Sequence, residues 1–325
     1  MRNFSGVATL LILSGLATMA LAADPPGWAY GFPPAGTPAT APAAPAPPDT
    51  SIKNLPGSTG AFTRAQISDR FGPADWYPGD HPAMPEIVAH GKKPDVFACS
   101  LCHYPNGKGR PENAGVAGLP TAYFIQQMND FKNGVRKSSE PRKANTNTMI
   151  TIAKGMTDDE IKAAADYFGS MKWTPWIKVV ESSTVPKTRI AGGMFLTLEG
   201  NEKESLGSRI IETPENAEGT EVLRDARSGF FAYVPMGSLK KGEALVTTGA
   251  GKTTRCAVCH GADLTGLGPV PGIAGRSPSY LMRQMVDMQQ GARHGVWSDL
   301  MKPVLSNLTE DDLLNISAYA ASRKP

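Results

Sequence analysis

Two stretches of the chain place apolar side chains at the spacing of an α-helix. One begins near Thr121 and the other near Ser277, and in each the apolar positions recur three or four residues apart. These positions are Phe124, Met128 and Phe131 in the first stretch, and Leu281, Met285 and Met288 in the second. Each stretch is therefore predicted to be a helix with one buried face.

A further helix is predicted downstream of each stretch. Thr157 and Thr309 both precede three acidic residues, at 158–160 and 310–312. A threonine at the N-cap accepts hydrogen bonds from free backbone N–H groups, and acidic residues in the first turn complement the helix dipole. The apolar positions that follow are Ile161, Ala164, Ala165 and Phe168 in one helix, and Leu313, Ile316 and Ala320 in the other.

These similarities belong to an internal repeat with a separation of 157 positions, which matches Cys102 to Cys259 and His103 to His260. Further identities are Ala117-Gly118 with Ala274-Gly275, Tyr123 with Tyr280, Gln127 with Gln284, Gly134 with Gly291, and Arg136 with Arg293. The first copy is then longer by five residues, which aligns Met149 with Met301. Repetition over about 80 residues indicates one small, mostly helical unit used twice.

The residues between the two units, 174–236, have a different pattern. The runs 176–180, 195–198 and 229–234 are rich in β-branched and aromatic residues, and Gly and Pro interrupt them. We expect an irregular connecting segment with short β-strands, packed against or between the helical units.

The N-terminus is apolar and then rich in proline. Arg2 precedes an apolar run up to Leu21, and small residues at 20 and 22 predict signal-peptide cleavage before Ala23. Residues 1–22 are therefore expected to direct export, and an uncleaved membrane anchor is the alternative. Residues 23–60 are rich in Pro, Ala, Gly and Thr, so we expect an extended tether.

Charge excludes one class of function. Charged residues make up 19% of the chain and the formal net charge is only +3. Nucleic-acid binders concentrate positive charge to neutralise phosphates, so no nucleic-acid partner is expected.

The cysteines point to a specific chemistry. All four lie in two CxxC pairs, Cys99/Cys102 and Cys256/Cys259, and a histidine follows each pair directly. CxxCH is the attachment motif of c-type haem, in which the thiols bond the haem edge and the histidine ligates the iron. A thioredoxin-type redox pair or a zinc site also uses CxxC, but neither requires the adjacent histidine. We therefore predict two covalently bound haem c groups, with His103 and His260 as axial ligands.

The second axial ligand of each iron is predicted from the repeat. Met149 and Met301 occupy equivalent positions eight residues before a capped helix, in stretches expected to be non-helical. Met156 is the rival in the first unit, but its counterpart is Leu308, which cannot bind iron. We therefore expect the pairs His103/Met149 and His260/Met301.

Each ligand histidine also needs an acceptor for its other ring nitrogen. Pro271 supplies a carbonyl on a rigid Gly/Pro loop, whereas the first unit has Ala114 at that place. Looser support is therefore expected for His103 than for His260.

Together these residues resemble class I cytochromes c, and more closely the diheme c4 type. The resemblance rests on CxxCH, then residues 271–275, 280–285 and 291–293, and on the corresponding signals in the first unit. It implies helical haem folds, a periplasmic location and one-electron transfer with partner proteins. The expected fold is mostly α, with two class I cytochrome c domains (61–173 and 237–325) joined by the segment 174–236.

Three functions follow as hypotheses. The leading one is a periplasmic carrier of single electrons between a dehydrogenase and a respiratory acceptor, without catalytic residues of its own. The second is an enzyme, either a diheme peroxidase or a thiosulfate-oxidising cytochrome, which needs an open or labile iron position. The third is an electron-transfer subunit of a dehydrogenase complex. Peripheral association with a membrane stays open.

Overall fold

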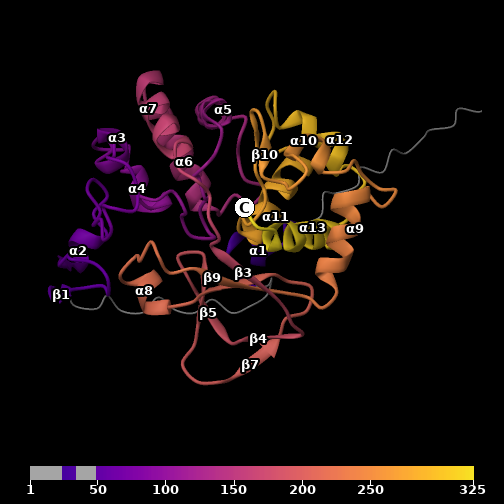
Figure 1. Ribbon diagram of the computed structural model, residues 1–325, viewed down its shortest axis with the longest axis horizontal. Coiled ribbons are helices and arrows are strands. Elements are labelled where there is room, and N and C mark those ends of the chain that lie inside the picture. Colours follow the sequence, from indigo (N-terminus) through magenta and orange to yellow (C-terminus); the bar gives the residue numbers. More distant parts are fainter. Residues whose placement is uncertain (1–23, 34–48) are drawn as a thin grey trace, which may run out of the picture.

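The computed structural model describes residues 24–33 and 49–325. The predicted signal peptide and residues 34–48 of the Pro/Ala-rich segment lie outside the described residues. Figure 1 shows the helices of the two repeats on two sides of the molecule, with a group of strands beneath them. None of the described helices is long and apolar enough to span a membrane.

The first repeat consists of short helices around an apolar cluster. The elements are α3 (Glu86–Ala89), α4 (Cys99–His103), α5 (Thr121–Lys132), α6 (Ala144–Gly155) and α7 (Asp158–Gly169). Helix α5 packs against both α6 and α7. Met128, Phe131, Ile161 and Phe168 are buried in this cluster, so the apolar faces predicted from the spacing form its core.

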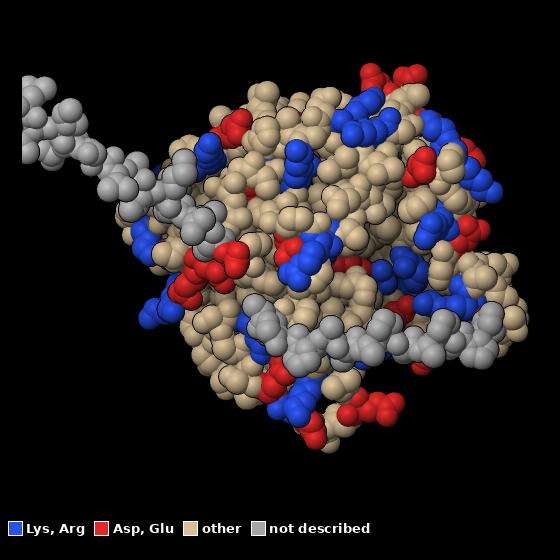
Figure 2. All heavy atoms as spheres, turned by 180° about the vertical axis from the view of Figure 1, so that it is seen from behind, with Lys and Arg blue, Asp and Glu red and all other residues tan. Residues whose placement is uncertain are grey.

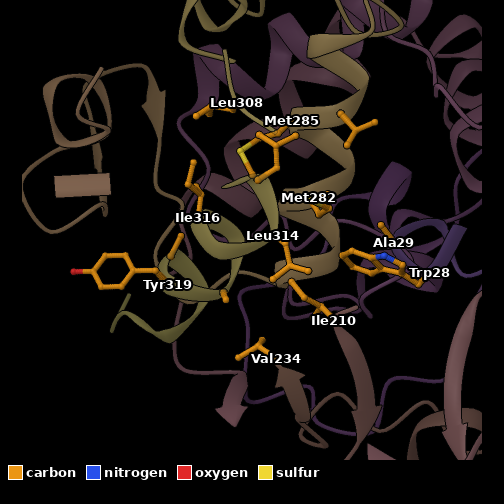
Figure 3. Packing of buried hydrophobic residues seen from close by; sticks show 14 of the residues in the cluster. Trp28, Ala29, Ile210, Val234, Met282, Met285, Leu308, Leu314, Ile316 and Tyr319 are labelled. Atoms are coloured by element: carbon orange, nitrogen blue, oxygen red, sulfur yellow. The ribbon is translucent and has the colours of Figure 1, made fainter. Parts of the chain in front are cut away.

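The second repeat has helices that correspond to α4, α5 and α7 of the first, and it begins with a longer helix, α9. Its elements are α9 (Ser238–Thr248), α10 (Ala257–His260), β10 (Gly266–Leu267), β11 (Val270–Pro271), α11 (Pro278–Gln289), the 3₁₀-helix η1 (Asp299–Met301), α12 (Lys302–Leu305) and α13 (Glu310–Ser322). Helix α13 packs against α9 and α11. Figure 3 shows its buried residues Leu314 and Ile316 in the cluster that also contains Met282 and Met285 of α11.

Both predicted threonine caps are confirmed. The Thr157 hydroxyl accepts a hydrogen bond from the Glu160 N–H at 3.2 Å, and the Glu160 carboxylate accepts one from the Thr157 N–H at 2.7 Å. Thr309 and Asp312 form the same reciprocal pair in α13. Because both pairs satisfy N–H groups that a helix start leaves free, they fix where α7 and α13 begin.

The expectation that Met149 and Met301 lie in non-helical stretches is wrong. Met149 lies within α6, and Met301 ends η1 directly before α12. Residues 145–148 alternate Asn and Thr, which have low helix propensity and argue for a loop. Packing overrides that propensity, because Ile152 and Ala153 of α6 are buried in the first repeat's core.

The middle segment forms the predicted short strands. They are β3 (Ile177–Glu181), β4 (Thr184–Pro186), β5 (Thr188–Ala191), β6 (Met194–Thr197), β7 (Lys203–Ser205), β8 (Ile211–Pro214) and β9 (Phe230–Val234), with helix α8 (Ala217–Glu221) between the last two. One sheet has the order β3-β9-β8, in which β3 is parallel to β9 and β8 is antiparallel to it. The pairs β4-β7 and β5-β6 are antiparallel.

The stretch before the first repeat has a small core of its own. It contains β1 (Ile52–Lys53), β2 (Phe62–Thr63) and α2 (Arg64–Ile67). Leu55, Ile67, Trp76 and Tyr77 are buried together, and the Trp76 indole N–H donates to the Leu223 carbonyl at 2.6 Å. This part of the chain therefore packs against the middle segment.

The extended tether expected over residues 23–60 is contradicted at both of its described ends. At the C-terminal end, β1 pairs with β2 and Leu55 is buried. Residues Gly27–Tyr30 form helix α1, and Trp28, Ala29 and Tyr30 are at most 8% exposed. Helix α1 packs against α11, and Figure 3 shows Trp28 and Ala29 beside the second repeat's core. The Pro/Ala-rich composition of the whole segment gave no sign of this helix. Trp28 and Tyr30 nevertheless supply enough apolar area for it to dock.

Candidate haem sites

The first CxxCH motif forms helix α4, and its histidine faces a cavity of about 110 Å³. His103 Nδ1 lies 2.8 Å from the Ala114 carbonyl oxygen. Burial lowers the pKa of His103, so the imidazole is neutral and Nδ1–H donates to that carbonyl. Nε2 is then left with a free lone pair, as an iron ligand requires. Met149 lines the same cavity.

The second motif repeats this arrangement around a cavity of about 210 Å³. His260 Nδ1 lies 2.8 Å from the Pro271 carbonyl oxygen, and burial lowers the pKa of His260 too. Cys256, Cys259 and Met301 line the cavity with His260. Both predicted carbonyl acceptors are confirmed, and the equal distances show that the looser support expected for His103 is wrong.

Other methionines border the cavities as well. Met128 lines the first, and Met285 and Met288 line the second. Met156 is buried in the core but does not line the first cavity. Met149 and Met301 therefore each share a cavity with the predicted histidine partner, and their role as ligands stays a prediction.

The alternatives for the cysteines find no support. The four thiols are not joined in disulfides, and burial raises the pKa of Cys99 to about 12 and of Cys256 to about 11. A reactive redox pair needs a lowered thiol pKa instead. Among the described residues, no three His, Cys, Asp or Glu side chains cluster as a metal site would require.

A reciprocal hydrogen-bond network separates the two cavities. Arg136 donates to Gln127 (2.9 Å), Gln284 (2.9 Å) and Tyr280 (3.3 Å), while Arg293 donates to Gln284 (2.8 Å), Gln127 (2.7 Å) and Tyr123 (2.9 Å). The two arginines also pair their backbones as an antiparallel bridge. Tyr123, Tyr280 and Gln284 line both cavities, so the cavities share this wall.

Comparison with known proteins identifies the family. A model described as cytochrome c matches residues 88–172. The cytochrome c-554(548) of Halomonas halodenitrificans is 35% identical over 77 residues, which are 23% of this chain and 93% of that protein. The chain belongs to the cytochrome c family.

Two further relatives indicate which type of cytochrome c the chain resembles. Cytochrome c4 of Pseudomonas aeruginosa is 40% identical over 77 residues, or 23% of this chain and 37% of that protein. The thiosulfate dehydrogenase electron acceptor of Stutzerimonas stutzeri is 25% identical over 236 residues, or 71% of this chain and 82% of that protein. The chain is a diheme class I cytochrome c that resembles the c4 type, and it binds haem c covalently.

The second cavity shows polar groups that fit this cofactor. Arg293 Nε and Ser298 Oγ are buried there without a hydrogen-bond partner among the described residues. Unpartnered buried donors are costly, and the carboxylates of a bound haem would offer the acceptors that these two groups lack. Bound haem c supplies a one-electron iron couple. The four cysteines of the two motifs would hold it by thioether bonds, and the Ala114 and Pro271 carbonyls would orient the ligand histidines.

The surroundings of the two CxxCH motifs in this cytochrome differ sharply. Cys99 Sγ lies 3.6 Å from the Ile87 carbonyl oxygen, and Ser100 donates to the Val88 carbonyl at 2.9 Å, so helix α3 covers the first motif. Trp76, Tyr77 and Ala226, from outside the repeat, close over it as well.

In the part of the chain that the structure describes, no comparable cover lies over the second motif. Cys259 is exposed, and Val258 between the two cysteines is 55% exposed. Leu300, next to Met301, lines the second cavity and is 73% exposed. Figure 1 shows α10 and α12 close together at an outer end of the molecule. The second haem site is therefore open to the outside through an apolar rim.

The residues of the shared wall had no predicted role. Tyr123, Gln127 and Arg136 appeared in the sequence only as identities with the second unit. The sequence did hold a sign of their role. These three polar residues recur in the second repeat at the same separation, although most other identities in these segments are small or apolar residues. Their pairing across the repeats needs the tertiary structure.

Proposed function

We propose that this cytochrome carries single electrons between a periplasmic dehydrogenase and a respiratory acceptor. Cys99 and Cys102 attach one haem and Cys256 and Cys259 the other, with the axial pairs His103/Met149 and His260/Met301. The observation that carries the proposal is the shared wall of the two cavities. Two redox sites separated by one layer of side chains suit the passage of electrons through the molecule.

The residues act by holding each site in one geometry. The Ala114 and Pro271 carbonyls fix the imidazole rings, and a hydrogen-bonded Nδ1–H raises the basicity of Nε2. A methionine as the other axial ligand favours the reduced iron and raises the potential. The buried network of Arg136 and Arg293 holds the two repeats at a constant separation.

The partner class is inferred from a relative. The Stutzerimonas stutzeri protein, named for accepting electrons from thiosulfate dehydrogenase, matches most of both chains. A dehydrogenase as donor to this cytochrome is consistent with that match and with the export signal predicted at residues 1–22. The units 61–173 and 237–325 would each carry one haem, and the strands of 174–236 would keep them together.

The test is spectroscopic. The mass of the purified protein should include two haem additions, and its spectrum should be low-spin with the weak far-red methionine–iron band. We expect Met149→Ala and Met301→Ala each to remove about half of that band. Met128→Leu and Met288→Leu, which change cavity-lining methionines on α5 and α11, should leave the band intact.

The same preparation separates a carrier from an enzyme. The carrier should be reduced and reoxidised by two electrons without turnover of peroxide or thiosulfate. A high-spin haem in the resting protein together with turnover of either compound would contradict the proposal.

A further inference from the structure

One buried position differs in charge between the two repeats. The identical pair Ala117-Gly118 and Ala274-Gly275 is followed by Leu119 in the first repeat and by Arg276 in the second. Arg276 is 4% exposed, although it carries a guanidinium. A buried charge without a repeat counterpart calls for a function specific to the second site.

Neutral groups hold this guanidinium. Arg276 donates to the backbone carbonyls of Gly272 (2.7 Å), Gly115 (2.8 Å) and Ala117 (3.1 Å), and its Cζ lies 4.5 Å from the centre of the Trp173 ring. Burial lowers the pKa of Arg276 to about 10, so it stays protonated at neutral pH. A full positive charge is therefore held in place without a carboxylate partner among the described residues.

The charge borders the second haem site. Arg276 lines the cavity together with His260 and Met301, and none of the described residues that line it is acidic. Arg255 and Arg293 are the other charged residues of this lining. The first cavity is lined by the cations Arg136, Lys137, Lys143 and Arg283, and there, by contrast, Glu112 and Asp287 offset part of the positive charge.

We propose that Arg276 stabilises the reduced state of the second haem and so raises its reduction potential. Oxidation adds one positive charge at the iron, and a nearby buried cation opposes that charge in a medium of low dielectric. Leu119 exerts no such effect in the first repeat. The inference rests on the two-haem carrier function proposed above, and it makes Arg276 a tuning residue that touches no electron partner.

The experiment is a redox titration of the holoprotein, followed in the visible spectrum. Arg276→Leu introduces the residue of the first repeat, and Arg276→Lys keeps the charge but cannot make the same three hydrogen bonds. The titration is run near pH 6, because burial can lower the pKa of a lysine substantially. Met301→Ala identifies which of the two titration steps belongs to the second haem.

We expect Arg276→Leu to move the second haem's step to a more negative potential and to leave the other step in place. Arg276→Lys should stay close to the wild type in potential, even if its thermal midpoint falls as far as that of the leucine variant. An unchanged potential in Arg276→Leu, an equal shift in both variants, or a shift confined to the first haem would overturn the inference. Absence of two titrating haems in the wild type would instead overturn the proposed function.

Discussion

At the scale of single residues, Arg136 and Arg293 are the most interdependent side chains of this cytochrome. Both are less than 10% exposed, and both donate to the same two glutamines. We expect Arg136→Gln to destabilise the holoprotein by about 3 kcal/mol, because it removes three charge-assisted hydrogen bonds from a buried network. The shift of the thermal unfolding midpoint measures this effect.

Because the two arginines share acceptors, the losses of stability caused by replacing each of them should not be additive. Once Arg136 is replaced, Arg293→Gln should cost less than it does in the wild type, because their common network is already broken. Lys137→Gln is the matched control: it is adjacent but exposed, and should change stability by no more than about 0.5 kcal/mol. Additive losses from the two arginine variants would show two independent interactions instead.

At the scale of elements, helix α1 joins the N-terminal segment to both repeats. Tyr30 donates to Asp287 of α11 at 2.8 Å, and the Tyr30 carbonyl accepts from Lys143 at 3.2 Å. Arg283 donates to the Ala29 carbonyl at 2.7 Å. A four-residue helix of this kind is stabilised by its docking rather than by its own hydrogen bonds.

Trp28→Ala should therefore release α1 and destabilise the second repeat. Loss of a buried tryptophan costs about 3–5 kcal/mol in a core that cannot collapse around the cavity. Thermal unfolding measures the loss, and limited proteolysis should show faster cleavage within residues 24–33. Asp24→Ala is the control, since Asp24 is exposed. Equal behaviour of the two variants would mean that α1 contributes nothing to the fold.

The elements differ in how far the sequence could predict them. Helices α5, α7, α11 and α13 followed from apolar spacing and from the threonine caps, which are local signals. Helix α6 did not, because its Asn/Thr run opposes a helix and its stability depends on packing in the core of the first repeat, including contacts with α5. Helix α1 did not either, because its docking depends on α11, some 250 positions further along the chain.

The haem sites likewise combine features that follow from the local sequence with features that depend on tertiary contacts. His103 and His260 with their carbonyl acceptors were predictable because motif and acceptor lie eleven residues apart. The shared wall was not, since it forms between side chains 144 to 170 positions apart. Nor was the full cover over the first CxxCH motif, because Trp76, Tyr77 and Ala226 come from segments outside the repeat.

At the scale of the whole molecule, the exposed side chains of Val258 and Leu300 mark a candidate docking face at the second CxxCH motif. Figure 2 shows acidic and basic side chains intermingled over the face that it draws. The apolar rim formed by Val258 and Leu300 lies beside the uncovered CxxCH motif. Electron-transfer partners form small, short-lived contacts.

This arrangement predicts that electrons enter and leave through the second haem site. Val258→Glu and Leu300→Glu should each slow electron self-exchange between oxidised and reduced molecules by about tenfold, because a buried unpaired carboxylate opposes contact. Reduction by a small neutral reductant should stay unchanged. Leu198→Glu is the matched control: it is 42% exposed and follows strand β6, whose partner β5 Figure 1 places far from α10 and α12. If Leu198→Glu slowed self-exchange as much as the rim variants, the slowing would come from the change in net charge. That result would contradict the prediction that molecules make contact at the second haem site.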